Sequence, residues 1–324
     1  MAQKALLAAI DHYPNPQNNL PSCLTDARAF ERMLRGTFGF TEIKSLSDAE
    51  ANLANVEAGL DWLFAGAAPS DSIVFYFSGH GYQARRGDNL DEVLCLYDGF
   101  LFDDALSQRT RSLPPGVFTL VCDSCHSGGM YKIMADPQAG DAVQVAQAKI
   151  LRVPPPEEAD KAFVGPADVR SLRYKPFCCE AGAPAAIAKK FGLAVPKGFD
   201  EGGQLAMNGL LLSACLEDET ASASTPKTDG KSAFTFALLR QIEALGPDVS
   251  NARLVEALTK SLRDLGFRQT PVLMEPPTPA GLADRTFLTL GEGKPTTGTS
   301  GIPVPGNDVI RVVQETINKL REAA

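Results

Sequence analysis

The sequence predicts an α/β protein with a mostly parallel sheet flanked by helices. Short apolar runs of strand length alternate with segments of helical spacing through the first third of the chain. This β-α-β-α-β order is typical of parallel sheets with right-handed crossovers. Two of the runs, Ile73–Phe77 and Val117–Val121, end in reactive side chains followed by glycine. Groups at the ends of such strands lie where open α/β sheets bind their ligands.

The composition limits the kinds of partner. The chain has 324 residues, enough for one large α/β domain or two smaller ones. Hydrophobic residues make up 44% and charged residues 22%, as in ordinary soluble proteins. The formal net charge of −8 argues against nucleic acid or an anionic membrane as the main partner, but not against cationic peptides. No apolar run reaches the length of a membrane span.

The cysteines and the start of the chain indicate a cytoplasmic protein. Seven cysteines are spread without a framework spacing, which favours free thiols in a reducing compartment. The apolar part of Met1–Ile10 is too short for a signal peptide and predicts a first strand instead. We therefore expect no prodomain before that strand.

The first half of the chain is expected to hold four strands and three helices. The strands are predicted at Ala5–Ile10, Ile43–Leu46, Ile73–Phe77 and Val117–Val121. Helices are predicted at Thr25–Leu34, with Thr25 or Asp26 as the N-cap, at Asn52–Ala67, and in a short segment opening at Asp103. Gly87–Glu92 is expected to form an acidic loop.

The second half divides into three parts. Residues 130–204 are rich in proline, alanine and glycine and predict a long inserted loop, with one short helix near 185–191. Residues 205–290 are expected to hold strands at Gly209–Leu216, Pro271–Met274 and Thr286–Leu290, and helices at Ser232–Leu245 and Ser250–Leu265. Residues 291–324 predict a linker and an amphipathic helix, which docks on its own domain or binds a partner or a second copy.

The segment Cys122–His126 (CDSCH) fits several chemistries. Its pattern matches covalent haem attachment, and its Cys-x-x-Cys matches redox or zinc sites. Haem attachment normally requires export, zinc lacks two further well-spaced ligands, and a redox motif would open a helix rather than a glycine turn. A nucleophilic Cys125 fits better, because backbone N–H groups near it can hold an oxyanion. His80, between two glycines, is the candidate acid and base. His126 is the weaker candidate, because adjacent side chains of an extended chain point apart.

These residues resemble the signature motifs of a known family. Ser78–Gly81 (SGHG) and Asp123–Gly128 (DSCHSG) are similar to the two motifs of the metacaspases, caspase-like cysteine peptidases whose bacterial members are also called orthocaspases. The likeness covers about residues 4–128 and 208–290. It implies a caspase-like sheet in a single catalytic domain, with a large-subunit part at 1–129 and a small-subunit part at 205–290.

The resemblance also implies roles for individual residues. Cys125 would be the nucleophile, His80 the base and then the acid, and the backbone N–H groups of Cys125 and Gly81 the oxyanion donors. Metacaspases cleave after Arg or Lys, and the matching pocket positions are Asp26 and Asp123, lined by Cys23 and Ser78. The residues themselves agree, because two carboxylates near the nucleophile suit a cationic side chain.

Calcium and cleavage of the chain are further expectations of the resemblance. The chemistry needs no cofactor, but many metacaspases need Ca²⁺, and Asp103 and Asp104 with Asp91 or Asp88 match its carboxylates. The alternative is a solvated acidic loop, and the family's usual carboxylate is missing after Gly128. The insertion is expected to cover the cleft until the enzyme or an upstream protease cuts it, after a basic residue such as those at Arg152, Arg170, Arg173 and Lys175.

Two other functions stay open from the residues. One is a catalytically silent scaffold that binds partners through its last helix. The other is a redox switch that uses Cys122 and Cys125. A role in programmed cell death accompanies the resemblance, but nothing in the residues points to it.

Overall fold

The computed structural model describes residues 2–86, 89–125, 147–149, 173–175, 207–216, 219–276 and 281–288. Residues 83–86, 89–91, 104 and 173–175 are described by their backbone alone. Residues 1–293 form one compact unit and 294–324 another, and the second unit, with the expected C-terminal helix, lies outside the described residues. The short helix expected near 185–191 lies outside them as well.

A six-stranded sheet forms the centre of the first unit, in the order β10-β9-β7-β3-β1-β2. Five strands are parallel and β10 is antiparallel to β9 at one edge. The sheet confirms the predicted fold class, since both halves of the sequence contribute neighbouring strands. The bounds are β1 Gln3–Ala9, β2 Glu42–Ser47, β3 Ser72–Ser78, β7 Phe118–Asp123, β9 Leu210–Ser213 and β10 Val272–Met274.

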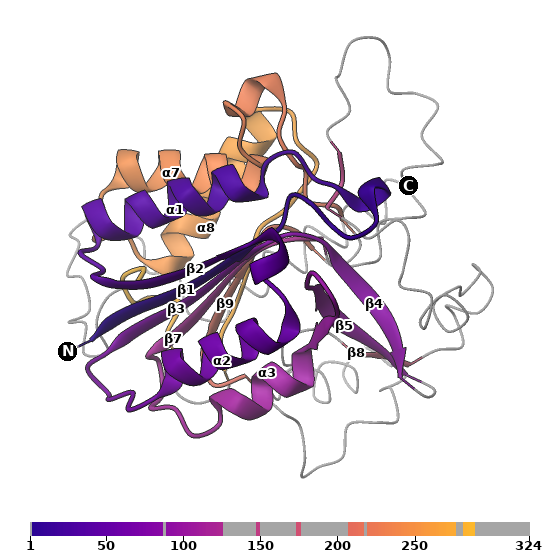
Figure 1. Cartoon of the computed structure of the whole chain (residues 1–324). Coiled ribbons are helices and arrows are strands. Elements are labelled where there is room, and N and C mark those ends of the chain that lie inside the picture. The colour runs from indigo at the N-terminus through magenta and orange to yellow at the C-terminus, as the bar shows by residue number, and fades with distance from the viewer. Residues whose placement is uncertain are drawn as a thin grey trace, which may run out of the picture. The chain divides into compact units, whose positions relative to one another are not determined.

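Helices cover both faces of this sheet (Figure 1). On one face lie α1 (Cys23–Thr37), α7 (Ala233–Leu245) and α8 (Asn251–Asp264), and on the other lie α2 (Leu53–Phe64) and α3 (Asp103–Thr110). Because they are covered on both sides, β3 and β7 are buried along their whole length, which explains their continuous apolar sequences. Short 3-10 turns occur at Pro16–Asn18, Asp48–Glu50 and Pro226–Thr228.

A second, smaller sheet follows His80. It pairs β4 (Gly81–Arg86), β5 (Asn89–Cys95) and β6 (Phe100–Phe102) antiparallel, and β8 (Arg173–Lys175) lies parallel to β5. The expected acidic loop at Gly87–Glu92 is therefore wrong in part, since residues 89–92 belong to β5. Residues 87 and 88 lie outside the described part of the chain.

Two more predictions from the sequence need correction. Helix α1 begins at Cys23 with Ser22 as its N-cap residue, so neither Thr25 nor Asp26 is the cap. Asp26 instead lies in the first turn, fully buried. Thr286 forms an isolated bridge with Ser250, and Leu288 has a φ of 54°, so residues 286–288 do not form the expected strand.

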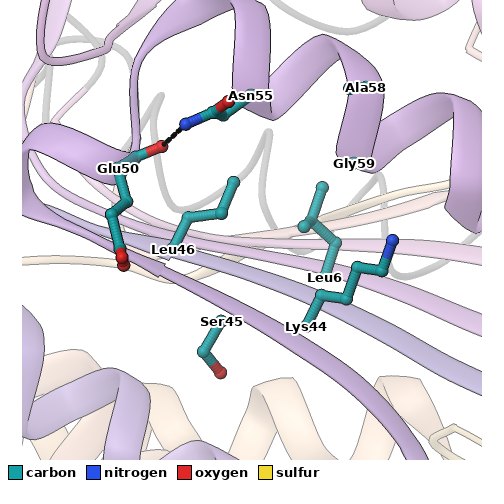
Figure 2. Close-up of a pocket in the computed structure, with 8 residues that line it drawn as sticks. All are labelled: Leu6, Lys44, Ser45, Leu46, Glu50, Asn55, Ala58 and Gly59. Carbon is teal, nitrogen blue, oxygen red and sulfur yellow. Dashed lines mark hydrogen bonds between the residues drawn. The ribbon is translucent and has the colours of Figure 1, made fainter.

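A surface hollow of about 300 Å³ lies between α2 and strands β1 and β2. Figure 2 shows Glu50 and Lys44 at opposite ends of it, with Leu6 and Leu46 between them. Gly59 forms part of its wall, and a Cβ there would lie 2.7 Å from the Leu6 side chain. No cysteine or histidine lines the hollow, so it does not contain the candidate catalytic residues.

Among the helices that the structure describes, none combines the length and apolar character needed to cross a membrane.

Candidate active site

Neighbouring strands bring Cys125 and His80 to the same edge of the sheet. In the β3–β7 ladder Ser78 pairs with Asp123, two residues before each functional side chain. Just beyond, the Gly79 N–H donates to the Asp123 carbonyl at 3.4 Å. Both reactive residues are buried at this point. The site thus lies at the carboxyl ends of two parallel strands, as the sequence predicted.

Position 81 requires glycine because the Cys125 backbone approaches it closely. A Cβ built on Gly81 would lie 1.8 Å from the Cys125 carbonyl oxygen, far inside any allowed contact. Only glycine therefore lets the two backbones meet, and their N–H groups then point to a common position.

His80 is held by the loop that precedes α1. Its Nε2 lies 2.6 Å from the Asn18 carbonyl oxygen. Because a carbonyl oxygen only accepts, Nε2 must carry the hydrogen, so Nδ1 is the proton acceptor of the neutral ring. The Tyr13 ring packs at 4.9 Å from the imidazole, and its hydroxyl accepts from the His80 N–H at 2.9 Å. The loop therefore fixes both the position and the tautomer of His80, the candidate base.

The predicted specificity pocket, formed by Cys23, Asp26, Ser78 and Asp123, contains the side chain of Lys149. The Lys149 ammonium lies 2.8 Å from Ser78 Oγ and 3.0 Å from Asp123 Oδ1. It also lies 3.0 Å from the Asp123 carbonyl oxygen and 3.3 Å from Asp26 Oδ2. Lys149, Asp26 and Asp123 are all fully buried. The pocket thus holds a cation that comes from the chain itself.

Helix α7 and its N-cap residue Ser232 donate hydrogen bonds to both carboxylates. Asp26 accepts from the Ser232 backbone N–H at 2.8 Å and from its hydroxyl. Asp123 Oδ2 accepts from Thr235 Oγ1 at 2.6 Å, and the Tyr76 hydroxyl lies 2.7 Å from Thr235 Oγ1. Since Thr235 donates to Asp123, Tyr76 must donate to Thr235. The two carboxylates thus lie at the amino end of α7, where the helix dipole stabilises negative charge.

The charges in this pocket shift each other's pKa. Burial alone lowers the pKa of Lys149, but the charges of Asp123 and Asp26 outweigh burial and raise it. Burial raises the pKa of Asp26 to about 6, although Lys149 acts in the opposite direction. Burial also raises the pKa of the Cys23 thiol, which keeps that pocket side chain protonated. The lysine is therefore charged between two carboxylates that are costly to leave without a cation.

The backbone of Lys149 contacts the candidate catalytic residues Gly81 and Cys125. Its carbonyl oxygen accepts from the Gly81 N–H at 3.1 Å and from the Cys125 N–H at 3.3 Å. These are the two donors that the resemblance assigned to an oxyanion hole. The Cys125 thiol accepts from the Ala221 N–H at 3.1 Å beside this carbonyl. The Lys149 carbonyl group is therefore placed as the reacting group of a bound substrate would be.

The backbone of Ala221–Ala223 pairs with the segment 147–149 and holds it in an extended form. The Lys149 N–H donates to the Ala221 carbonyl at 3.0 Å, and the Ala223 N–H donates to the Gln147 carbonyl at 2.8 Å. Ala148 forms the antiparallel bridge with Ser222 between them. Such main-chain pairing accepts any extended peptide, because it uses no side chain.

The structure brings the predicted catalytic and pocket residues together: Cys125, His80, Gly81, Asp26, Asp123, Cys23 and Ser78. Sequence reasoning missed Lys149, Asn18, Ser232 and Thr235. The one available signal for Lys149 was its positive charge within the insertion. His126 lies outside the described residues.

Of the expected calcium carboxylates of Asp91, Asp103 and Asp104, the structure describes only the side chain of Asp103. In the small sheet Asp91 lies on β5, whose ladder with β6 ends at Val93 and Phe102, and Asp103 and Asp104 follow as the first residues of α3. Asp103 is buried at the start of α3. Within the described part of the chain, no three His, Cys, Asp or Glu side chains gather as a metal site. The side chains of Asp91 and Asp104 lie outside that part.

The sequence profile of one protein family, described as the caspase domain, matches residues 2–279. Metacaspase-9 of Arabidopsis thaliana is 27% identical over 321 residues, which cover 89% of this chain and 98% of the plant protein. Metacaspase-1A of Aspergillus niger is 33% identical over 145 residues, 39% of this chain and 36% of the fungal protein. The chain thus matches little more than a third of that fungal relative.

Among solved structures, a Geobacter sulfurreducens protein covers 90% of this chain and is itself covered completely. Its TM-score is 0.59 and its sequence identity 23%. At this identity the comparison supports the fold alone.

Proposed function

The chain belongs to the caspase domain family and is a cysteine peptidase, and we propose that it is an endopeptidase that cleaves proteins after Lys or Arg. The observation that carries this proposal is the position of Lys149. Its ammonium group lies between Asp26 and Asp123 while its carbonyl group accepts from Gly81 and Cys125. A substrate residue before the scissile bond, called P1, would bind in the same way.

The proposed mechanism uses the Cys125–His80 dyad. His80 Nδ1 takes the proton from the Cys125 thiol, and the thiolate attacks the P1 carbonyl carbon. The N–H groups of Gly81 and Cys125 hold the oxygen as it becomes negative. His80 then gives its proton to the leaving amine, and water, deprotonated by His80, releases the acyl group from sulfur.

The same position of Lys149 makes the intact chain a zymogen in this proposal. The pocket, the oxyanion donors and the Ala221–Ala223 edge are all occupied by residues 147–149, so no other peptide can enter. The bond from Lys149 to Ile150 is the first bond that the enzyme would cut. This site replaces Arg152, Arg170, Arg173 and Lys175 as our preferred position, and cleavage by an upstream protease elsewhere in 130–204 remains compatible with it.

The test combines mass spectrometry with a peptide assay. The wild-type protein should produce a new N-terminus at Ile150 and then hydrolyse a peptide with Lys or Arg before aminomethylcoumarin. Cys125→Ala should do neither, and Lys149→Arg should still be cut. Fragments that form equally in Cys125→Ala would assign the cut to another protease. Absence of Cys125-dependent hydrolysis by the cut protein would overturn the peptidase function.

We also propose that Ca²⁺ activates the enzyme through the carboxylates of Asp91, Asp103 and Asp104. Hard oxygen donors on β5 and at the start of α3 suit this ion. Calorimetric titration should detect Ca²⁺ binding by Cys125→Ala, and adding Asp103→Asn should weaken it at least about tenfold, while adding Asp98→Asn should not. Equal binding by all three proteins would exclude these carboxylates as the ligands.

The alternative functions receive less support. A silent scaffold does not account for a substrate-like lysine between the oxyanion donors and the acidic pocket. In a redox switch Cys122 would have to ionise readily, but burial raises the pKa of that thiol to about 12. The described cysteines are all free thiols, in keeping with the reducing, cytoplasmic setting that we propose. The natural substrates are then proteins with an accessible basic residue.

A further inference from the structure

The segment 147–149 makes a second side-chain contact besides that of Lys149. Gln147 lies two residues before Lys149, at the position called P3, on the same side of the extended chain. Its side-chain amide, Nε2, donates to the Asn19 carbonyl oxygen at 2.7 Å. The remaining contacts of the segment with Ala221–Ala223 are main-chain bonds, which carry no sequence preference.

The acceptor for Gln147 is rigidly held. The Asn19 N–H donates to the Pro16 carbonyl at 3.2 Å, and Asn19 Oδ1 accepts from the Tyr13 N–H at 2.9 Å. The preceding carbonyl, that of Asn18, holds His80. The loop therefore cannot turn the Asn19 carbonyl away from a poorly matched side chain without disturbing the catalytic base.

A carbonyl oxygen can only accept, so it favours a P3 side chain that donates. Glutamine and lysine can donate to it. Glutamate has nearly the shape of glutamine but presents an oxygen with negative charge, and methionine has a similar length without a donor. A net hydrogen bond in a half-buried position corresponds to about three- to tenfold in an equilibrium or rate.

We propose that the Asn19 carbonyl selects substrates whose P3 side chain is a hydrogen-bond donor, so that the enzyme reads two positions, a cation at P1 and a donor at P3. This inference rests on the proposed peptidase function. It narrows the substrate class from any protein with an exposed lysine or arginine to those with a donor two residues earlier.

The test uses the self-cleaved full-length protein and peptides based on residues 144–149. The parent is acetyl-Gln-Val-Ala-Gln-Ala-Lys-aminomethylcoumarin, and three others carry Glu, Met or Lys at P3. We expect kcat/KM for Gln and Lys to exceed that for Glu and Met by about three- to tenfold. A control with Glu in place of the first Gln has the same net charge as the P3 Glu peptide and should match the parent.

The outcomes separate the two claims. If all the peptides are cleaved equally, or if the control loses as much as the P3 Glu peptide, P3 selection is wrong although the peptidase function stands. If none is cleaved, the peptidase function itself fails. Within the chain, Gln147→Glu and Gln147→Met should slow cutting after Lys149 about three- to tenfold, and Gln147→Lys should not. Unfolding temperatures of the same changes in Cys125→Ala distinguish slower chemistry from a damaged fold.

Discussion

Lys149 brings a full positive charge into a pocket from which water is excluded. Removing a charge from water costs several kcal/mol, and the attraction to Asp26 and Asp123 together with the Ser78 hydroxyl offsets that cost. The converse also holds, since the two buried carboxylates are unfavourable without a cation between them. A neutral P1 side chain would leave both charges uncompensated, which is the physical basis of the P1 preference that we propose.

The Asp26 carboxyl group makes binding of a P1 cation dependent on pH. Its pKa is about 6, raised by burial, with Lys149 in the pocket, and Lys149 itself acts to lower it. When the lysine leaves, that lowering is lost and the pKa rises further. A P1 cation therefore displaces a proton, so its affinity falls as the pH falls through the Asp26 pKa.

This dependence can be measured on the double variant Lys149→Ala, Cys125→Ala, in which the pocket is open and no chemistry occurs. Titration calorimetry should find a P1 lysine peptide bound at least about fivefold more weakly at pH 5.5 than at pH 8, since one pH unit corresponds to about tenfold. The same peptide with norleucine at P1 should show no such change. Equal affinity of the lysine peptide at both pH values would contradict the role of Asp26.

Replacing Gly81 should disable the oxyanion hole. In Gly81→Ala the new methyl group would collide with the Cys125 carbonyl oxygen, so one or both N–H donors must move. Loss of one such donor typically lowers kcat about 10²- to 10³-fold. Gly36→Ala is the matched control, because a Cβ there meets nothing within 4 Å and activity should not change. Peptide hydrolysis by the two variants decides the matter, and wild-type kcat in Gly81→Ala would refute the assignment.

The strands and helices that could be predicted are those whose own residues carry a recognisable pattern. Strands β3 and β7 could be predicted because their apolar runs are continuous and end in the His and Cys motifs. Strand β4 was missed because Gly81–Arg86 carries no such run, and its pairing with β5 depends on the partner. Lys149 was missed for the same reason, since an extended segment held by Ala221–Ala223 leaves no periodic signal in its own sequence.

Helix α7 contacts the proposed P1 pocket through Thr235, which donates to Asp123. Thr235→Val keeps the shape of the side chain but removes the donor to Asp123 and the acceptor for Tyr76. Leaving these buried groups unmatched should destabilise the protein by about 1–3 kcal/mol and raise KM for P1 lysine peptides. Tyr76→Phe, which leaves the Thr235–Asp123 bond intact, should affect KM less. Thermal unfolding and steady-state kinetics test both variants, and an unchanged KM in Thr235→Val would exclude this contribution.

The candidate active site combines residues that precede the insertion (130–204) in the sequence with residues that follow it. Cys125, His80, Asp26 and Asp123 precede it, whereas Ser232, Thr235 and the edge Ala221–Ala223 follow it. Strand β9 pairs with β7 within the main sheet, so the later part of the chain completes the core as well as the site. A cut within the insertion therefore breaks one peptide bond but leaves the pairing between β7 and β9 in place.

The two fragments produced by the cut after Lys149 should stay together. The β7–β9 pairing and the buried contacts of α7 with Asp26 and Asp123 hold them without a peptide bond. Cleaved protein should elute in size-exclusion chromatography at the position of the intact chain and give two bands after denaturation. Cys125→Ala should give one band. Fragments that separate in native buffer would show that the insertion itself is needed for cohesion.

The attachment of Lys149 to its own enzyme sets a competition that dilution cannot relieve. A ligand joined covalently to its binding site acts at an effective concentration that can reach the order of millimolar, whatever the protein concentration. Hydrolysis after Lys149 frees only one side, because residues 126–146 still join Gln147 to Cys125. The new carboxyl terminus therefore competes with every incoming substrate as a product attached to the enzyme. Full activity then requires that this end be trimmed away or held elsewhere.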